Sequence, residues 1–160
     1  MGLFDWLFRG RNREGRDNDL NTELAHWRIA EIEGDSGSVV VARIRMRRPE
    51  LLDLDQYTTA VSISWPIVDD TVSPEMSAAM DQFEVSMEDF ESFSYLIQVR
   101  TGLGERNWLY YTSDGDRLTT AIRSRLITHG WPLTIEATED PSWAEWRVLA
   151  ERISGTTVRH

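Results

Sequence analysis

The 160-residue sequence contains no cysteine and no lysine. Without cysteine the chain has no disulfide, no thiol nucleophile and no thiolate metal ligand, as suits a protein that folds outside an oxidising compartment. Without lysine it has neither a Schiff-base nucleophile nor the lysine of a phosphate-binding loop. These absences favour a cytoplasmic location and exclude several classes of enzyme.

Histidine is scarce as well, because His26, His129 and His160 are the only three and lie in different parts of the chain. No two of them have the spacing of paired metal ligands. The acidic residues at 69–70 and 114–116 lack the repeated oxygen ligands of a calcium loop and are typical of turns or helix starts. No Gly-x-Ser-x-Gly nucleophile motif occurs. We therefore expect no metal, no cofactor and no catalytic residues of these recognisable kinds.

Positive charge is missing from one long stretch. No basic residue lies between Arg48 and Arg100, and the stretch holds eleven acidic residues, while the net charge of the whole chain is -10. Such a surface repels nucleic-acid phosphate and anionic lipid, and it attracts basic proteins. The pattern therefore predicts a protein partner, of basic character, and no nucleic acid.

The N-terminal residues 1–8 are apolar but too short to span a bilayer, and arginines follow this run instead of preceding it, unlike a secretory signal. One interpretation is a short helix that docks on the domain or on a second copy of it, which would make a homo-oligomer. The other is a peripheral membrane foot over residues 1–16. We divide the chain into this segment with an arginine-rich linker (1–22), a single domain (23–155) and a tail (156–160).

Alternating apolar residues predict a hairpin over 27–47, with its turn at 34–37, and a further strand over 57–65. On the second hairpin strand the arginines at alternate positions are either solvated or paired with the acidic stretch. Ser73-Pro74-Glu75 predicts a helix start. The apolar stripe of that helix is Met76, Met80, Phe83, Met87 and Phe90. Its opposite face carries Asp81, Glu84, Glu88, Asp89 and Glu91.

A second hairpin is predicted by four alternating apolar residues, Phe93, Tyr95, Ile97 and Val99. A turn at 101–105 leads from them into a strand over 107–112. Ser113 or Asp114 caps the next helix, and Gly130 ends it in a left-handed conformation.

The predicted chain ends with a strand over 133–137 and a terminal helix that starts at Asp140-Pro141. From residue 57 onward the order is strand, helix, strand, strand, helix, strand. This order indicates an α+β fold with a ferredoxin-like split βαβ antiparallel sheet and two helices on one face. The N-terminal β-hairpin and the C-terminal helix are additions to it.

Two motifs resemble a known family. They are Asn-Trp-Leu-Tyr-Tyr-Thr-Ser-Asp at 107–114 and Asp-Pro-Ser-Trp-Ala-Glu-Trp-Arg at 140–147. They are similar to the aromatic strand and the closing Asp-Pro-x-Trp segment of the bacterial domain of unknown function 695 family (DUF695). The resemblance covers about residues 57–147 and implies a ferredoxin-like α+β domain, without any activity. Trp146 departs from the family pattern, which has tyrosine or phenylalanine at a different spacing.

We consider three functions. The first is a non-catalytic interaction or regulatory domain that binds a basic protein through Asp81, Glu84, Glu88, Asp89 and Glu91, although such a run is equally typical of a solvated helix face. Trp143 and Trp146 would join this surface if exposed, and otherwise belong to the core. The second is a small hydrolase-type enzyme with carboxylates and Tyr110 or Tyr111 in a pocket. The third is a peripheral membrane scaffold anchored by residues 1–16.

Overall fold

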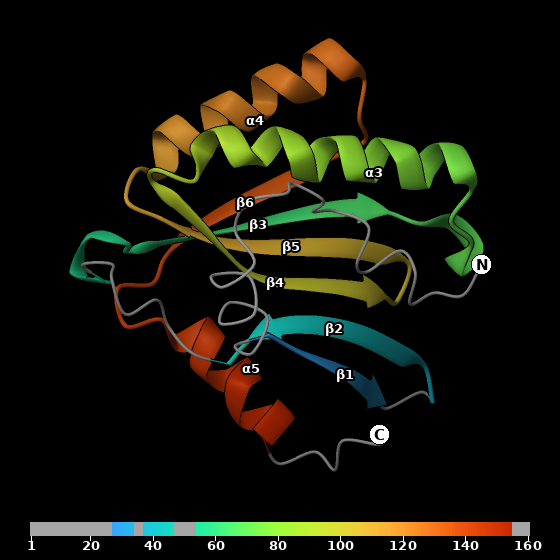
Figure 1. Cartoon of the computed structure of the whole chain (residues 1–160), viewed down its shortest axis with the longest axis horizontal. Coiled ribbons are helices and arrows are strands. Elements are labelled where there is room, and N and C mark those ends of the chain that lie inside the picture. The colour runs from blue at the N-terminus through green and yellow to red at the C-terminus, as the bar shows by residue number, and fades with distance from the viewer. Residues whose placement is uncertain (1–26, 34–36, 47–53, 155–160) are drawn as a thin grey trace, which may run out of the picture.

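A computed structural model describes residues 27–33, 37–46 and 54–154. These residues form a mixed α+β domain with a six-stranded antiparallel sheet and three α-helices (Figure 1). Several sequence-based expectations lie outside the described residues. These are the apolar segment and linker of 1–22, the membrane foot of 1–16, most of the hairpin turn at 34–37, and the tail of 156–160.

The strands are arranged in the order β1-β2-β4-β5-β3-β6, and all neighbours are antiparallel. Their bounds are Trp27–Glu33 (β1), Val39–Arg45 (β2), Thr59–Pro66 (β3), Ser94–Gly102 (β4), Glu105–Thr112 (β5) and Thr134–Glu139 (β6). Pairing of β1 with β2 confirms the predicted N-terminal hairpin, which extends the sheet beyond β4. The six-stranded order therefore differs from that of a four-stranded split βαβ sheet.

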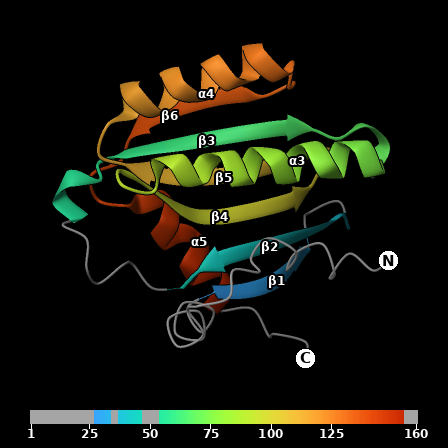
Figure 2. The ribbon, with the colours of Figure 1, turned by 45° about the horizontal axis from the view of Figure 1, so that its top comes forward.

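Helices cover both faces of the sheet. Helices α3 (Pro74–Met87) and α4 (Gly115–His129) lie on one face, and α5 (Ala144–Ser154) lies on the other (Figures 1 and 2). Phe83 and Ile122 bury the first two helices against a core on the first face. Trp143, next to α5, belongs to a separate core on the second face. The sheet is thus the middle of three layers.

The ends of α3 and α4 follow the predicted caps. Ser73 Oγ accepts the N–H of Met76 at 3.1 Å, and a proline occupies the first position of α3. Asp114 accepts the N–H of Arg117 at 2.9 Å, and Gly130 ends α4 with a φ of 68°. Because each cap binds groups within a few residues of itself, local sequence is sufficient to predict these ends.

Strand β4 departs from the predicted alternation. Its pairing with β5 shifts register between Leu96 and Gln98, which leaves Ile97 as an extra residue. Such a bulge moves the side chains that follow it to the other face of the sheet. Val99 therefore lies in the core under α3, whereas Ile97 lies in the core on the α5 side. Phe93 also lies under α3, but it precedes the first residue of β4. The regular alternation predicted for these residues is therefore wrong.

Candidate functional site

The predicted acidic helix face divides into an inward and an outward part. Four of its residues are exposed: Asp81 on α3, Glu88 and Asp89 on the 3-10 turn η3 (Glu88–Phe90) that follows it, and Glu91 directly after η3. The side chain of Glu84 is only 26% exposed and lies on the flank of α3 that faces the sheet. The structure thus differs from the sequence-based expectation at Glu84.

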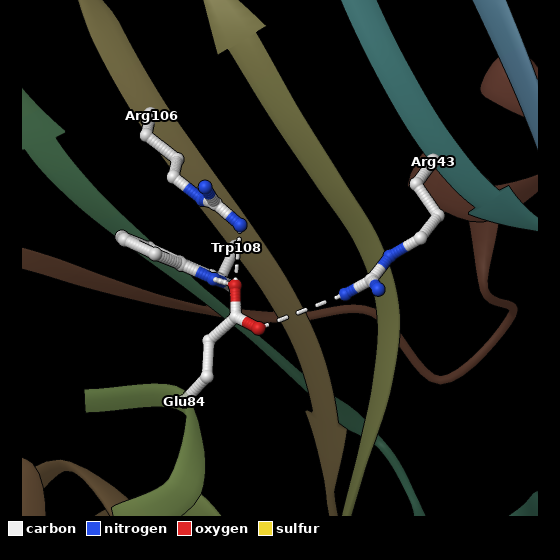
Figure 3. A network of polar contacts seen from close by, with 4 residues as sticks. All are labelled: Arg43, Glu84, Arg106 and Trp108. Atoms are coloured by element: carbon white, nitrogen blue, oxygen red, sulfur yellow. Dashed lines mark hydrogen bonds and ion pairs between the residues drawn. The ribbon is translucent and has the colours of Figure 1, made fainter. Parts of the chain in front are cut away.

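Glu84 is the centre of a polar network between α3 and the sheet (Figure 3). Its Oε1 accepts hydrogen bonds from Arg106 Nη2 at 2.5 Å and from Trp108 Nε1 at 2.8 Å. Its Oε2 lies 3.9 Å from Nη2 of Arg43. Burial lowers the pKa of Arg106 from its ordinary value to about 10, although the charge of Glu84 opposes this shift. Glu84 therefore joins α3 to β5 and β2.

The arginines of β2 are engaged within the domain. Arg43 pairs with Glu84, so the interpretation of pairing with the acidic stretch holds at this position. Arg45 is 7% exposed, donates from Nε to the carbonyl of Leu96 at 3.0 Å, and stacks on Trp27 at 4.6 Å. Stacking of this kind stabilises a guanidinium group that is removed from water. The third arginine of the pattern, Arg47, lies outside the described residues.

Asp89 forms an ion pair between the two helices of the first face. Its Oδ2 accepts a hydrogen bond from Arg125 Nη2 of α4 at 2.7 Å. The side chain of Asp89 is 73% exposed, so this pair contributes at most about 1 kcal/mol.

Asp81 and Glu88 lie one turn to either side of Val85, which is 56% exposed. The outer face of α3 therefore combines an apolar side chain with flanking carboxylates.

The two candidate tryptophans lie in or beside the second core. Trp143 is 1% exposed, its ring stacks on Tyr111 with centroids 4.1 Å apart, and its Nε1 donates to the carbonyl of Tyr57 at 2.9 Å. Trp146 is partly buried, and its Nε1 donates to the carbonyl of Arg45 at 2.7 Å. Both rings attach α5 to the sheet, as the core interpretation requires.

Asp140 joins α5 to β5. Its Oδ2 accepts the hydroxyl of Tyr111 at 2.6 Å and the N–H of Glu145 at 3.0 Å, and its Oδ1 accepts the N–H of Ala144 at 2.8 Å. The prediction of a capping aspartate is therefore confirmed. The prediction that Pro141 lies in the first helical turn is wrong, because α5 begins only at Ala144 after an intervening turn. The Asp-Pro-x-Trp segment thus has a structural role.

We expect acid to weaken this attachment of α5. Burial by itself would raise the pKa of Asp140, but the hydrogen bonds from Tyr111, Ala144 and Glu145 hold it below the ordinary value of 3.8. A carboxylate with a lowered pKa contributes stability that is present above its unfolded pKa and lost as the pH falls through its folded pKa. Wild-type protein should therefore be more stable than Asp140→Asn by about 1–2 kcal/mol at pH 6.

The difference between these two unfolding free energies should shrink between about pH 5 and pH 2. Urea denaturation at a series of pH values measures it, and Asp140→Asn is the matched control because asparagine keeps the shape of aspartate and does not titrate. A difference that stays constant over this range would contradict the assignment.

The tyrosines of the enzyme interpretation are both buried. Tyr110 is 5% exposed in the core under α3, and Tyr111 is fully buried against Trp143. Burial raises the pKa of both hydroxyls well above the ordinary value of 10, and for Tyr111 the hydrogen bond to Asp140 raises it further. Both hydroxyls therefore stay protonated at neutral pH, and neither lines the cavity described next.

A cavity of about 420 Å³ lies between the first turn of α4 and the ends of β3 and β6. Its carboxylates are Asp114, which caps α4, together with Asp116 and Glu139. Glu139 accepts the hydroxyl of Thr59 at 3.3 Å. Local sequence predicts Asp114 and Asp116 as a helix start. It gives no signal for Glu139, because only the pairing of β6 with β3 brings this residue to α4.

Two further features, a metal-binding cluster and a membrane-crossing helix, are absent from the residues that the structure describes. No group of three or more histidine, aspartate or glutamate side chains is arranged to hold a metal ion. No helix of this part has both the length and the apolar composition to cross a membrane.

Comparisons of the chain with protein-family models, with curated proteins and with solved structures find no match.

Proposed function

We propose that this chain is a non-catalytic protein-interaction domain that binds a basic partner through the outer face of α3 and η3. The supporting observation is that Asp81 and Glu88 are exposed one turn to either side of the exposed Val85, and that Glu91 is exposed directly after η3, all in the stretch that lacks basic residues. We name these four residues the acidic patch. An apolar centre with a charged rim is the usual arrangement of a protein interface.

Charge in the acidic patch would act mainly on the rate of association. Opposite charges steer a partner into contact, and salt screens this attraction. Within the described domain, Glu84 binds Arg106 and Asp89 binds Arg125. These two carboxylates should therefore contribute less to binding than their positions in the sequence suggest.

A pull-down from native lysate with the intact protein tests this function. We expect the combined variant Asp81→Ser, Glu88→Ser and Glu91→Ser to weaken binding of a basic partner by at least about tenfold, as should about 0.5 M salt. The matched control removes three other exposed charges, through Asp69→Asn, Glu145→Gln and Glu151→Gln, and should retain the partner. Recovery of the same partner by the variant without the acidic patch, or binding that does not depend on salt, would contradict this function.

We also propose that the core of this domain has a ferredoxin-like fold. The strands β4-β5-β3-β6 with α3 and α4 would form this core, to which β1, β2 and α5 are added. In this order β5 separates the two strands connected by α3, and β3 separates the two connected by α4, which supports a split βαβ arrangement. We propose further that residues 57–147 are related to the domain of unknown function 695 family. A member of that family with a different strand order would count against it.

A further inference from the structure

Strand β6 is an edge of the described sheet. It pairs with β3 on one side, and no described strand pairs with its other side. The N–H of Asp140 donates to the carbonyl of Thr58 at 2.7 Å, which sets the alternation of this antiparallel ladder. Even-numbered residues of β6 bond to β3, whereas the N–H and C=O groups of Ile135, Ala137 and Glu139 point away from the sheet.

This edge lacks most of the usual protection against strand addition. Natural edge strands carry charged residues, especially lysine, or proline or a bulge, or they are covered by another element. Strand β6 contains no basic residue and no proline, its register with β3 is continuous, and five of its six residues are exposed. Its charges, Glu136 and Glu139, are both negative. A second copy of β6 would bring four carboxylates to one seam, so the charge favours a basic strand.

The cavity beside α4 opens next to the same edge. Ala137 and Glu139 line it from β6, and Asp116 lines it from the first turn of α4. Side chains on paired strands point to the same face where their residues are opposite each other. A side chain opposite Ala137 or Glu139 would therefore point toward the cavity.

The carboxylates at this edge have no cationic partner in the described part of the chain. The ion pairs formed by Glu84, Asp89 and Glu105 do not include Asp116, Glu136 or Glu139. Negative charge therefore lies on both faces of the edge, with Glu139 and Asp116 on the α4 side and Glu136 on the other. An arginine or lysine from an added strand would supply the missing counter-charge on either face.

We propose that β6 binds an extended segment of another protein that carries arginine or lysine at alternate positions, and that this segment adds to the sheet as a further strand. Backbone hydrogen bonds to Ile135, Ala137 and Glu139 supply affinity for any extended chain. The carboxylates of Asp116 and Glu139 select a basic side chain on the α4 face. This docking edge is separate from the acidic patch on α3, and either can fail without the other.

Two peptides of equal charge test the proposal, acetyl-Arg-Val-Arg-Val-Arg-Val-amide (the valine peptide) and its counterpart with a methyl group on every backbone nitrogen (the methylated peptide). Methylation keeps the charge and the side chains but removes every backbone donor and so prevents a ladder. By fluorescence anisotropy with the full chain, the valine peptide should bind at least tenfold more tightly than the methylated peptide. Hydrogen exchange at Ile135, Ala137 and Glu139 should slow in the complex.

Variants of the chain separate backbone pairing from charge. Ala137→Pro removes an outward N–H without removing a bond to β3, and it should weaken binding at least tenfold, whereas Ala137→Val should not. Since proline can also disturb β6, the pair Asp116→Asn and Glu139→Gln gives a second measurement and should reduce the affinity and its salt dependence. Serine replacements at Asp81, Glu88 and Glu91 should affect both peptides equally and leave the preference for the valine peptide unchanged.

Three results would overturn the proposal. Equal affinity for the two peptides would mean charge attraction without strand addition. Absence of binding at about 1 mM valine peptide would mean that the edge is closed to partners. A dimer in analytical ultracentrifugation that Ala137→Pro converts to monomer would assign the edge to a second copy of the chain.

Discussion

Replacement of Glu84 by alanine should lower the free energy of unfolding by about 3 kcal/mol or more. The Glu84 carboxylate accepts hydrogen bonds from Arg106, which is 3% exposed, and from Trp108, which is fully buried. Without it, the buried guanidinium group of Arg106 loses this carboxylate, and the buried indole N–H of Trp108 loses its acceptor. Loss of one partner from a buried charge pair is costly because the other charge stays out of water.

Urea denaturation of a small set of variants checks this expectation. Glu84→Gln keeps an acceptor for Trp108 and should cost less than Glu84→Ala. Joint replacement of Glu84 and Arg106 by methionine should recover much of the loss, because the buried guanidinium of Arg106 is removed together with its partner. Glu88→Ala, on the exposed side of the same segment, is the matched control and should stay within about 0.5 kcal/mol of wild type. Equal effects at Glu84 and Glu88 would return Glu84 to the partner-binding candidates.

The second large effect is expected at Trp143. Trp143→Ala should lower the free energy of unfolding by about 3–5 kcal/mol, because it removes a buried ring that stacks on Tyr111 and donates to Tyr57. Trp143 has a φ of 57°, a conformation that bulky residues rarely adopt and that alanine would share. The substitution therefore loses the contacts without relieving the backbone.

Hydrogen exchange locates the effect of Trp143→Ala. Amides of α5 should exchange faster in this variant, while those of α3 and α4 on the opposite face should change less. Trp146→Phe is the comparison, because it keeps an aromatic ring and loses only the bond to the Arg45 carbonyl, with a cost of about 1 kcal/mol. Unchanged exchange in α5 would show that Trp143 does not hold this helix.

Sequence reasoning succeeded where the deciding contacts are local. Ser73 and Pro74 predicted the start of α3, and Asp114 and Gly130 predicted the ends of α4. Each of these residues acts on backbone groups within about four positions, so its partner is adjacent in the sequence. The alternation of β2 likewise predicted a half-buried strand, because the period of side chains along a strand does not depend on its neighbours.

Sequence reasoning failed where the partner is remote or where an extra residue intervenes. Glu84 has the helical spacing of a solvent-facing residue, but a tryptophan and an arginine 24 and 22 positions later draw it toward the sheet. The bulge at Ile97 leaves no mark in the apolar pattern, since it is a property of the pairing between β4 and β5. Glu139 meets α4 only because β6 pairs with β3.

The sequence by itself determined the charge of the surface, the absence of thiol and lysine chemistry, and the α+β order of the elements, because composition and local periodicity carry that information. Only the tertiary structure decided which carboxylates are bound within the domain and which are exposed. It directs Glu84 inward, pairs Asp89 with Arg125, and leaves Asp116, Glu136 and Glu139 along an unpaired edge. The physical reason is that a carboxylate meets a partner or water according to which remote strands and helices pack beside it.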